Sequence, residues 1–158
     1  MKYVYATHDR KAELRRLIER LHHLNGEYDN LLRPSQQLNE KLDILLDRDI
    51  SDKSSLLILA VDGERVVGVI AARIIDRELF EPRMVGKIGD IYVLPEYRRL
   101  GTGYKLIEKA EKELKARGAQ MIFAEFPLQN SLAASFYQSL GFRPLTGIYA
   151  KETGLTDK

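Results

Sequence analysis

The chain has 158 residues, the size of one domain that buries a hydrophobic core without disulfides or metals. Its 25 Lys and Arg residues nearly balance 23 Asp and Glu residues, which argues against a general nucleic-acid or membrane-surface binder but leaves room for local basic patches. Cysteine is absent, and this excludes disulfide scaffolds, thiolate zinc sites and cysteine nucleophiles.

The N-terminal third of the chain predicts one short strand and two helices. Residues 3–6 suit a strand, and leucines at helical spacing follow until Asn25-Gly26 ends the first helix. A second amphipathic segment begins at Pro34-Ser35 and extends to Leu46. Two helices are therefore expected before the sheet continues.

The middle of the chain predicts three strands in succession. Residues 56–61 form an apolar run, Asp62-Gly63 is typical of a tight hairpin turn, and residues 66–75 supply the returning strand. A fourth strand is predicted over residues 85–93 after a loop. We expect the third and fourth strands to be antiparallel neighbours.

A basic turn with two glycines connects the fourth strand to an amphipathic helix. Gly101 and Gly103 allow positive φ angles and a close approach to a ligand, and the unpaired N–H groups of the helix's first turn point toward that ligand. The helix dipole favours an anion at this position, so the turn predicts a phosphate site. Arg98 could add charge beside the phosphates, and the alternative for Arg98 and Arg99 is a solvated loop charge.

The C-terminal third predicts helix, strand, helix and strand in that order. The first helix ends at Gly118, residues 121–126 predict a fifth strand, and a helix capped by Asn130 or the next residue ends at Gly141. Residues 148–150 predict a last strand.

This order of elements predicts a mixed α+β fold. A mostly antiparallel central sheet is flanked by helices, and a right-handed crossover leads from the fourth strand through a helix to the fifth. Residues 1–152 are expected to form a single domain, and residues 153–158 a flexible tail. No apolar run is long enough to span a bilayer, so we expect a soluble, cytoplasmic protein.

Two motifs connect these elements to a known family. Residues 98–103 read Arg-Arg-Leu-Gly-Thr-Gly at the start of a helix, and a second motif, N-x-x-A-x-x-F-Y-x-x-x-G-F, follows downstream. A two-glycine turn alone is a weak signal, but two motifs in the right structural context are specific. The chain resembles the GNAT superfamily of N-acetyltransferases, whose coenzyme A signature is Q/R-x-x-G-x-G/A. The second motif is carried by Asn130, Ala133, Phe136, Tyr137, Gly141 and Phe142.

The resemblance implies a GNAT-like fold with an acetyl-coenzyme A site. In this family backbone N–H groups of the glycine turn hold the pyrophosphate, and the pantetheine arm lies between the fourth and fifth strands, which part from each other. An asparagine reaches the arm from the far side. The residues that match these positions are Ile91, Tyr92, Val93, Arg98, Arg99, Leu100, Gly101, Thr102, Gly103, Tyr104 and Asn130.

The resemblance also implies a general acid for acetyl transfer. Tyr137 matches the family tyrosine that protonates the departing thiolate, and a phenol can serve because that thiolate is itself basic. Simple core packing beside Phe136 is the alternative. A backbone N–H of the fourth strand, with Ile91 as our choice, would meet the developing oxyanion.

The general base is less clearly marked. Polyamine-type members of the family carry Glu-Asp in the fourth strand, where this chain has Gly89-Asp90. Asp90 through a water, or Glu125 on the fifth strand, are the candidates, and a structural carboxylate is the alternative for both. The missing glutamate leaves the polyamine-type base and substrate in doubt.

Two further polar features lie in the first helix and the loop after it. Adjacent histidines point about 100° apart on a helix, so His22-His23 predicts surface or packing residues and no metal site. Tyr28 and Asp29 lie in the loop that lines the acceptor side in relatives. They could recognise a cationic amine, or belong to a solvated loop.

The leading hypothesis is an N-acetyltransferase that moves an acetyl group from acetyl-CoA to a primary amine by direct transfer in a ternary complex, without a metal. A noncatalytic acyl-CoA-binding sensor or interaction domain is the alternative, because Gly89 stands where a glutamate base is expected. The acceptor would be a small-molecule or peptide amine. The resemblance also implies a possible homodimer, and we expect no nucleic-acid or membrane partner.

Overall fold

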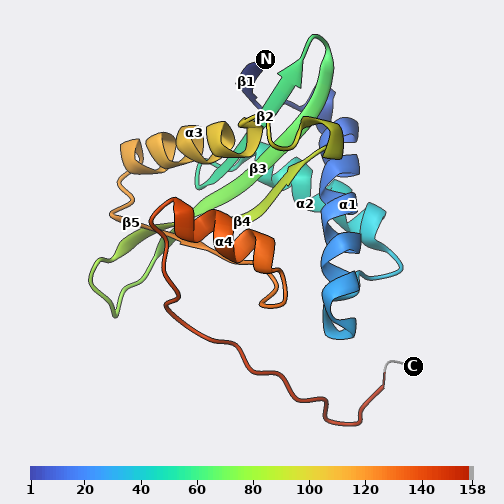
Figure 1. Ribbon diagram of the computed structural model, residues 1–158, viewed down its shortest axis with the longest axis vertical. Helices are drawn as coiled ribbons and strands as arrows, with labels where there is room; N and C mark the ends of the chain where they lie inside the picture. Colours follow the sequence, from blue (N-terminus) through green and yellow to red (C-terminus); the bar gives the residue numbers. More distant parts are fainter. Residues whose placement is uncertain (157–158) are drawn as a thin grey trace.

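The computed structural model describes residues 1–156 and shows one five-stranded mixed sheet with helices on both faces (Figure 1). The strands lie in the order β1-β2-β3-β4-β5. Their bounds are β1 Lys2–Tyr5, β2 Ser55–Asp62, β3 Arg65–Asp76, β4 Met84–Val93 and β5 Met121–Ala124. The helices are α1 Lys11–Tyr28, α2 Leu38–Ser51, α3 Thr102–Ala116 and α4 Ser131–Ser139.

The sheet has the predicted mixed topology. Each pair from β1 to β4 is antiparallel, and the β2–β3 hairpin turns at Gly63, which has a φ of 62°. β4 and β5 are parallel and are joined through α3. The α+β class and the crossover from the fourth to the fifth strand are therefore confirmed.

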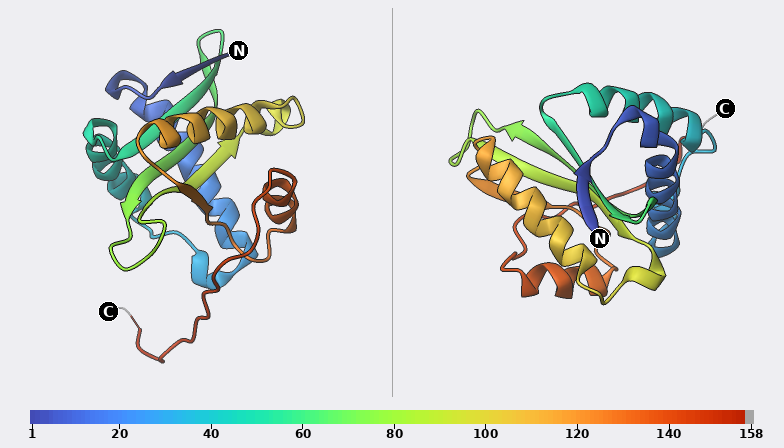
Figure 2. Two further views of the ribbon diagram at one scale, coloured as in Figure 1. Left: turned by 90° about the vertical axis from the view of Figure 1, so that its left-hand side faces the viewer. Right: turned by 90° about the horizontal axis from the view of Figure 1, so that it is seen from above.

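The helices form a layer on each side of the sheet. α1 and α2 cover one face, and α3 and α4 lie on the other (Figure 2). Fully buried leucines anchor both layers: Leu14 on α1, and Leu106 and Leu114 on α3. Burying such side chains contributes about 1.5–3 kcal/mol each. None of the helices within residues 1–156 is long and apolar enough to cross a membrane.

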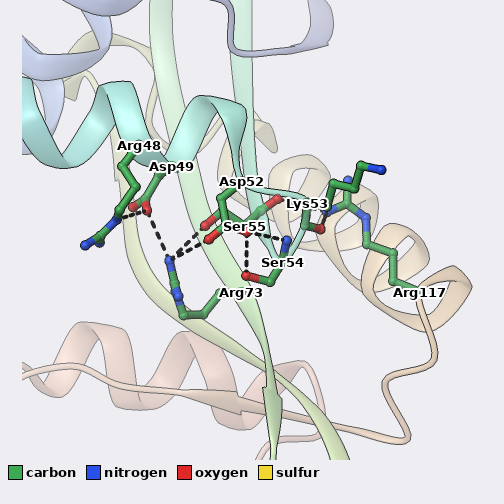
Figure 3. Close-up of polar contacts among 8 residues, drawn as sticks. All are labelled: Arg48, Asp49, Asp52, Lys53, Ser54, Ser55, Arg73 and Arg117. Atoms are coloured by element: carbon green, nitrogen blue, oxygen red, sulfur yellow. Dashed lines mark hydrogen bonds and ion pairs between the residues drawn. The ribbon is translucent and has the colours of Figure 1, made fainter.

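A polar network holds the segment that connects the end of α2 to the start of β2 (Figure 3). Arg73 of β3 donates to the Asp49 carboxylate at 3.1 Å and to the Ser55 hydroxyl at 2.8 Å. Arg117, just after α3, donates to the backbone carbonyls of Ser55 at 2.9 Å and Lys53 at 3.2 Å. The network joins α2, β2, β3 and the end of α3, so both helical layers are tied to the sheet.

The first helix and the fifth strand differ in length from the sequence prediction. α1 continues past Gly26 to Tyr28. A Cβ at Gly26 would lie 3.0 Å from the Cα of Arg33, so this glycine allows a close approach of the chain that follows and does not end the helix. β5 ends at Ala124, two residues earlier than predicted, because β4 and β5 stop pairing there.

The predicted last strand over residues 148–150 is wrong. Residues 142–156 contain no strand or helix, and the chain from residue 143 leads away from the sheet (Figure 1). Ile148 is 82% exposed and Tyr149 is fully exposed. An apolar run of three residues needs a neighbouring strand to become part of a ladder, and this segment has none within the described chain. Residues 157 and 158 of the predicted tail lie outside the described residues.

Gly86 allows α3 to approach the sheet, and enlarging it is expected to destabilise the protein. A Cβ at Gly86 would lie 2.7 Å from the nearest methyl carbon of buried Leu114. We expect Gly86→Ala to lower the free energy of unfolding by about 1–3 kcal/mol in urea denaturation, as overpacked cores do.

A double-mutant cycle separates this clash from a general effect of removing glycine. Gly86→Ala should cost clearly less in a Leu114→Ala background. Gly89→Ala is the matched control, because a Cβ there meets nothing within 4 Å. Equal costs at Gly86 with and without the Leu114 side chain would contradict the packing argument.

Candidate functional site

The edge of β4 is left free over its last residues. β4 and β5 are paired from Val85↔Met121 to Ile88↔Ala124, and the bond from the Glu125 N–H to the Ile88 carbonyl, at 3.2 Å, is the last between them. β4 continues to Val93 without a β5 partner in the described chain. Backbone donors and acceptors on that edge can therefore pair with an extended ligand.

A β-bulge lies where the two strands part. In the β3–β4 ladder Ala71 faces Asp90 and Ala72 faces Ile88, so Gly89 is an extra residue on β4. A bulge bends its strand and redirects the side chains that follow it. Asp90 is the first residue after the bulge, at the start of the free edge.

The glycine turn has the backbone geometry of an anion site. Gly101 is the N-cap of α3 with a φ of 81°, Arg99 also has a positive φ of 65°, and Gly101 provides no side-chain cap. The first N–H groups of α3, from Thr102 to Tyr104, precede the helix's own hydrogen-bond ladder. Leu100 is 70% exposed, whereas Thr102 is buried. These residues fit a pyrophosphate, since several N–H groups and a helix dipole converge on open space.

Arg98 is attached to the strand that precedes the turn. Its Nε donates to the Val93 carbonyl at 2.8 Å, and its guanidinium lies 5.3 Å from the centre of the Tyr92 ring. Arg98 therefore has a defined place, unlike a freely solvated loop charge. It ties the glycine turn to the end of β4.

Tyr137 lies in an aromatic cluster on α4. Its ring stacks on Phe126 at 5.2 Å and meets Phe136 and Phe142 edge-on at 5.4 and 5.2 Å. Only 4% of Tyr137 is exposed. Burial, followed by the negative charge of Asp90, raises the pKa of its phenol well above the ordinary value. The phenol is thus kept in the protonated form, which a general acid requires.

The two candidate bases lie close together in different environments. The Lys87 ammonium forms an ion pair with Glu125, which is half exposed. Asp90 is more deeply placed, and burial raises the pKa of its carboxyl above the usual range; Glu125 adds to this rise. A carboxylate with a raised pKa is a better proton acceptor, so the two environments distinguish Asp90 from Glu125.

A histidine that the sequence analysis set aside belongs to this cluster. The Nε2 of His22, on α1, lies 3.8 Å from the Asp90 carboxylate. Leu14, Ile18 and His22 are spaced by four residues, and the first two are buried. That spacing places His22 on the inner face of α1, which was the signal available in the sequence.

Asn130 and Asp29 already have structural contacts. The Asn130 side-chain oxygen accepts from the Ala133 N–H at 3.1 Å and caps α4, which leaves its amide nitrogen to donate elsewhere. Asp29 accepts from the Leu31 N–H at 2.8 Å and from the Gln129 amide at 3.2 Å. Asp29 therefore joins the loop after α1 to the loop before α4.

The remaining predicted residues lie around these groups. Ile91 is half-buried, and Tyr92 and Val93 are buried at the end of β4. Gly103 faces α4, since a Cβ there would lie 3.7 Å from Phe136, and Tyr104 is about half exposed beside it. Tyr28 is partly buried at the end of α1. In residues 1–156 no group of three acidic or histidine side chains is arranged to hold a metal ion.

Comparison with known families identifies the family of this chain. A model of the acetyltransferase (GNAT) family matches residues 18–142, which include His22, Asp90, the glycine turn and Tyr137. The chain belongs to the GNAT acetyltransferase family. The GNAT resemblance derived from the two motifs is therefore confirmed.

The sequence relatives carry names of N-acetyltransferases. An uncharacterized N-acetyltransferase of Archaeoglobus fulgidus is 35% identical over 92 residues, 58% of this chain and 62% of that protein. N-alpha-acetyltransferase 30 of Schizosaccharomyces pombe is 33% identical over 100 residues, 63% and 65% of the two chains. The ribosomal protein bS18-alanine N-acetyltransferase of Escherichia coli is 39% identical over 57 residues, 36% and 38%. The matches thus span less than two thirds of these relatives.

Solved structures of other proteins have the same fold. A tetramutant of the BH1408 protein of Bacillus halodurans superposes with a TM-score of 0.85 at 20% identity, over 96% of this chain and 99% of that one. The aminoglycoside N-acetyltransferase AAC(6')-Iy, solved in complex with CoA, gives a TM-score of 0.78 at 15% identity, over 98% and 95%. The GNAT-like fold is therefore found along almost the whole chain.

The Tyr137 phenol is expected to stay protonated throughout the pH range in which an unperturbed tyrosine side chain ionises. Absorbance near 295 nm should therefore rise equally for the wild type and for Tyr137→Phe between about pH 9 and 11, because the removed phenol does not ionise there while the protein is folded. If the absorbance of the variant rose by one tyrosine less than that of the wild type near pH 10, the buried placement of Tyr137 would be contradicted.

Proposed function

We propose that the protein is an N-acetyltransferase that moves an acetyl group from acetyl-CoA to a primary amine in a single ternary complex. One observation carries the proposal: β4 leaves β5 after Ile88, and its free edge leads directly to the glycine turn of α3. An extended thiol-bearing arm with a pyrophosphate at one end matches an open strand edge beside an anion site. The CoA complex of AAC(6')-Iy, which has the same fold, supports this assignment.

The reaction needs a neutral amine, a donor for the developing oxyanion and a proton for the leaving thiolate. Asp90, whose pKa is raised, accepts the amine proton directly or through a water, and Glu125 is the second candidate. A backbone N–H at Ile91 on the free edge of β4 meets the oxyanion. Tyr137, protonated and buried, supplies the proton to the thiolate sulfur.

The acceptor is a small-molecule or peptide amine. Relatives named as an N-alpha-acetyltransferase and a ribosomal protein bS18-alanine N-acetyltransferase, and a neighbour named as an aminoglycoside N-acetyltransferase, support an amine acceptor in general. They do not favour either class. Asp29 and Tyr28 are proposed to line its entrance. A homodimer is also proposed, because the apolar side chains of Ile148 and Tyr149 are exposed and available for a second copy. The expected cytoplasmic location stays a prediction.

Acetyl-CoA should bind saturably in isothermal titration calorimetry, and ATP should not. Gly101→Glu is expected to abolish binding for two reasons. The new carboxylate repels the phosphates, and the positive φ at this position is unfavourable for a residue with a side chain.

Gly118→Glu is the matched control for this experiment. Gly118 also has a positive φ, 98°, with nothing within 4 Å of a Cβ, but it lies beyond the other end of α3. The control variant should bind acetyl-CoA like the wild type. Failure of the folded wild type to bind acetyl-CoA would sink the proposal.

Tyr137→Phe distinguishes an enzyme from an acyl-CoA sensor. We expect thiol release in the presence of an amine panel to fall by about 10²–10⁴-fold, the usual contribution of a general acid, while acetyl-CoA still binds in calorimetry. Tight binding by the wild type without turnover on any amine would favour the sensor, in which the position of Gly89 has lost a base.

A further inference from the structure

A histidine outside both family motifs lies beside the proposed base. The His22 Nε2 is 3.8 Å from an oxygen of Asp90, and the two residues come from different elements, α1 and β4. The His22 side chain is 37% exposed and that of Asp90 is 26% exposed, so the pair extends from the inner part of the site toward its surface. A proton on Asp90 therefore has a neighbouring acceptor with access to solvent.

We propose that His22 is a positioning residue for acetyl transfer, which holds the Asp90 carboxylate at the free edge of β4 and conducts its proton to solvent. The inference rests on the proposed function, because it assigns a role in the same reaction. It names a residue that the GNAT motifs do not include.

The proton of the amine leaves the site through Asp90 and His22. As the amine nitrogen bonds to the acetyl carbon, its proton passes to an Asp90 oxygen, directly or through a water. The His22 imidazolium releases its own proton to water at the exposed side of α1 and then takes the Asp90 proton at Nε2 through a bridging water, which restores the pair of imidazolium and carboxylate. Tyr137 gives its own phenolic proton to the leaving thiolate, so the two transfers use separate protons.

The charges around Asp90 favour His22 over the other groups as the receiving residue. Glu125 carries a negative charge that is paired with Lys87, and Tyr137 holds its proton tightly. His22 is the cationic partner whose charge lowers the pKa of Asp90, against the rises caused by burial and by Glu125. Imidazole is also the side chain that gains and loses a proton near neutral pH.

The charge of His22 is expected to influence the pH at which Asp90 becomes a base. A positive charge at His22 favours the Asp90 carboxylate, so its removal raises the pKa of Asp90 further. Since the base must be deprotonated, His22→Gln should move the acidic limb of the kcat/KM profile to higher pH. Activity on that limb should fall about tenfold for each unit of movement.

His23→Gln is the matched control, because His23 is the adjacent residue and is exposed. It should leave the acidic limb in place. A uniform loss of activity in His22→Gln without movement of the limb would indicate a structural role and overturn the proposal. A folded His22→Asn variant replaces His22→Gln if the latter does not fold.

A double-mutant cycle and a direct titration complete the test. In an Asp90→Asn background His22→Gln should cause almost no further loss, since His22 acts through Asp90. Carboxyl ¹³C NMR should show a higher pKa for Asp90 in His22→Gln than in the wild type or in His23→Gln. Additive losses, or an unchanged Asp90 titration, would overturn the inference. If the wild type turned over no amine, the proposed function would be wrong. The NMR titration would still test the interaction of His22 with Asp90.

Discussion

The loss of pairing between β4 and β5 after Ile88 is the constraint on which the site depends. Backbone N–H and C=O groups need partners, and a parallel strand that parts from its neighbour leaves a row of them free. The end of β4 then continues through Arg98, which is bonded to Val93, into the turn at Gly101. The free edge thus leads directly into the helix N-terminus that we propose as the site for the anionic end of CoA.

Burial controls the acid–base properties of the groups beside this edge. Tyr137 and Asp90 both have raised pKa values, and in each case burial is the largest cause. The same rise in pKa suits the two groups to opposite tasks. A phenol with a raised pKa keeps its proton, whereas a carboxylate with a raised pKa has a higher affinity for a proton. Packing therefore leaves a protonated phenol near a carboxyl group whose proton affinity is raised.

Local sequence signals predicted most of the fold, including the glycine turn that precedes α3. The Asp62-Gly63 turn, the apolar strand runs and the two motifs depend on neighbours in the chain, and they correctly predicted the β2–β3 hairpin, the antiparallel β3–β4 pair and the glycine turn. The contacts of His22 with Asp90 and of Asp29 with Gln129 join segments distant in the sequence. The strand predicted at 148–150 failed because three apolar residues indicate a tendency and not a partner.

Under the proposed function, the bulge at Gly89 accounts for the missing glutamate of the polyamine-type pattern. A Cβ at this position would meet nothing within 4 Å, so packing does not require a glycine there. What the bulge provides is the placement of the next residue: Asp90 follows it at the start of the free edge, close to His22 of α1. A carboxylate after the bulge can replace one on it if a second group removes its proton. In the proposed mechanism the absence of the glutamate and the presence of His22 are two parts of one arrangement, in which Asp90 is connected to solvent by a side chain of α1, the helix that packs against β4.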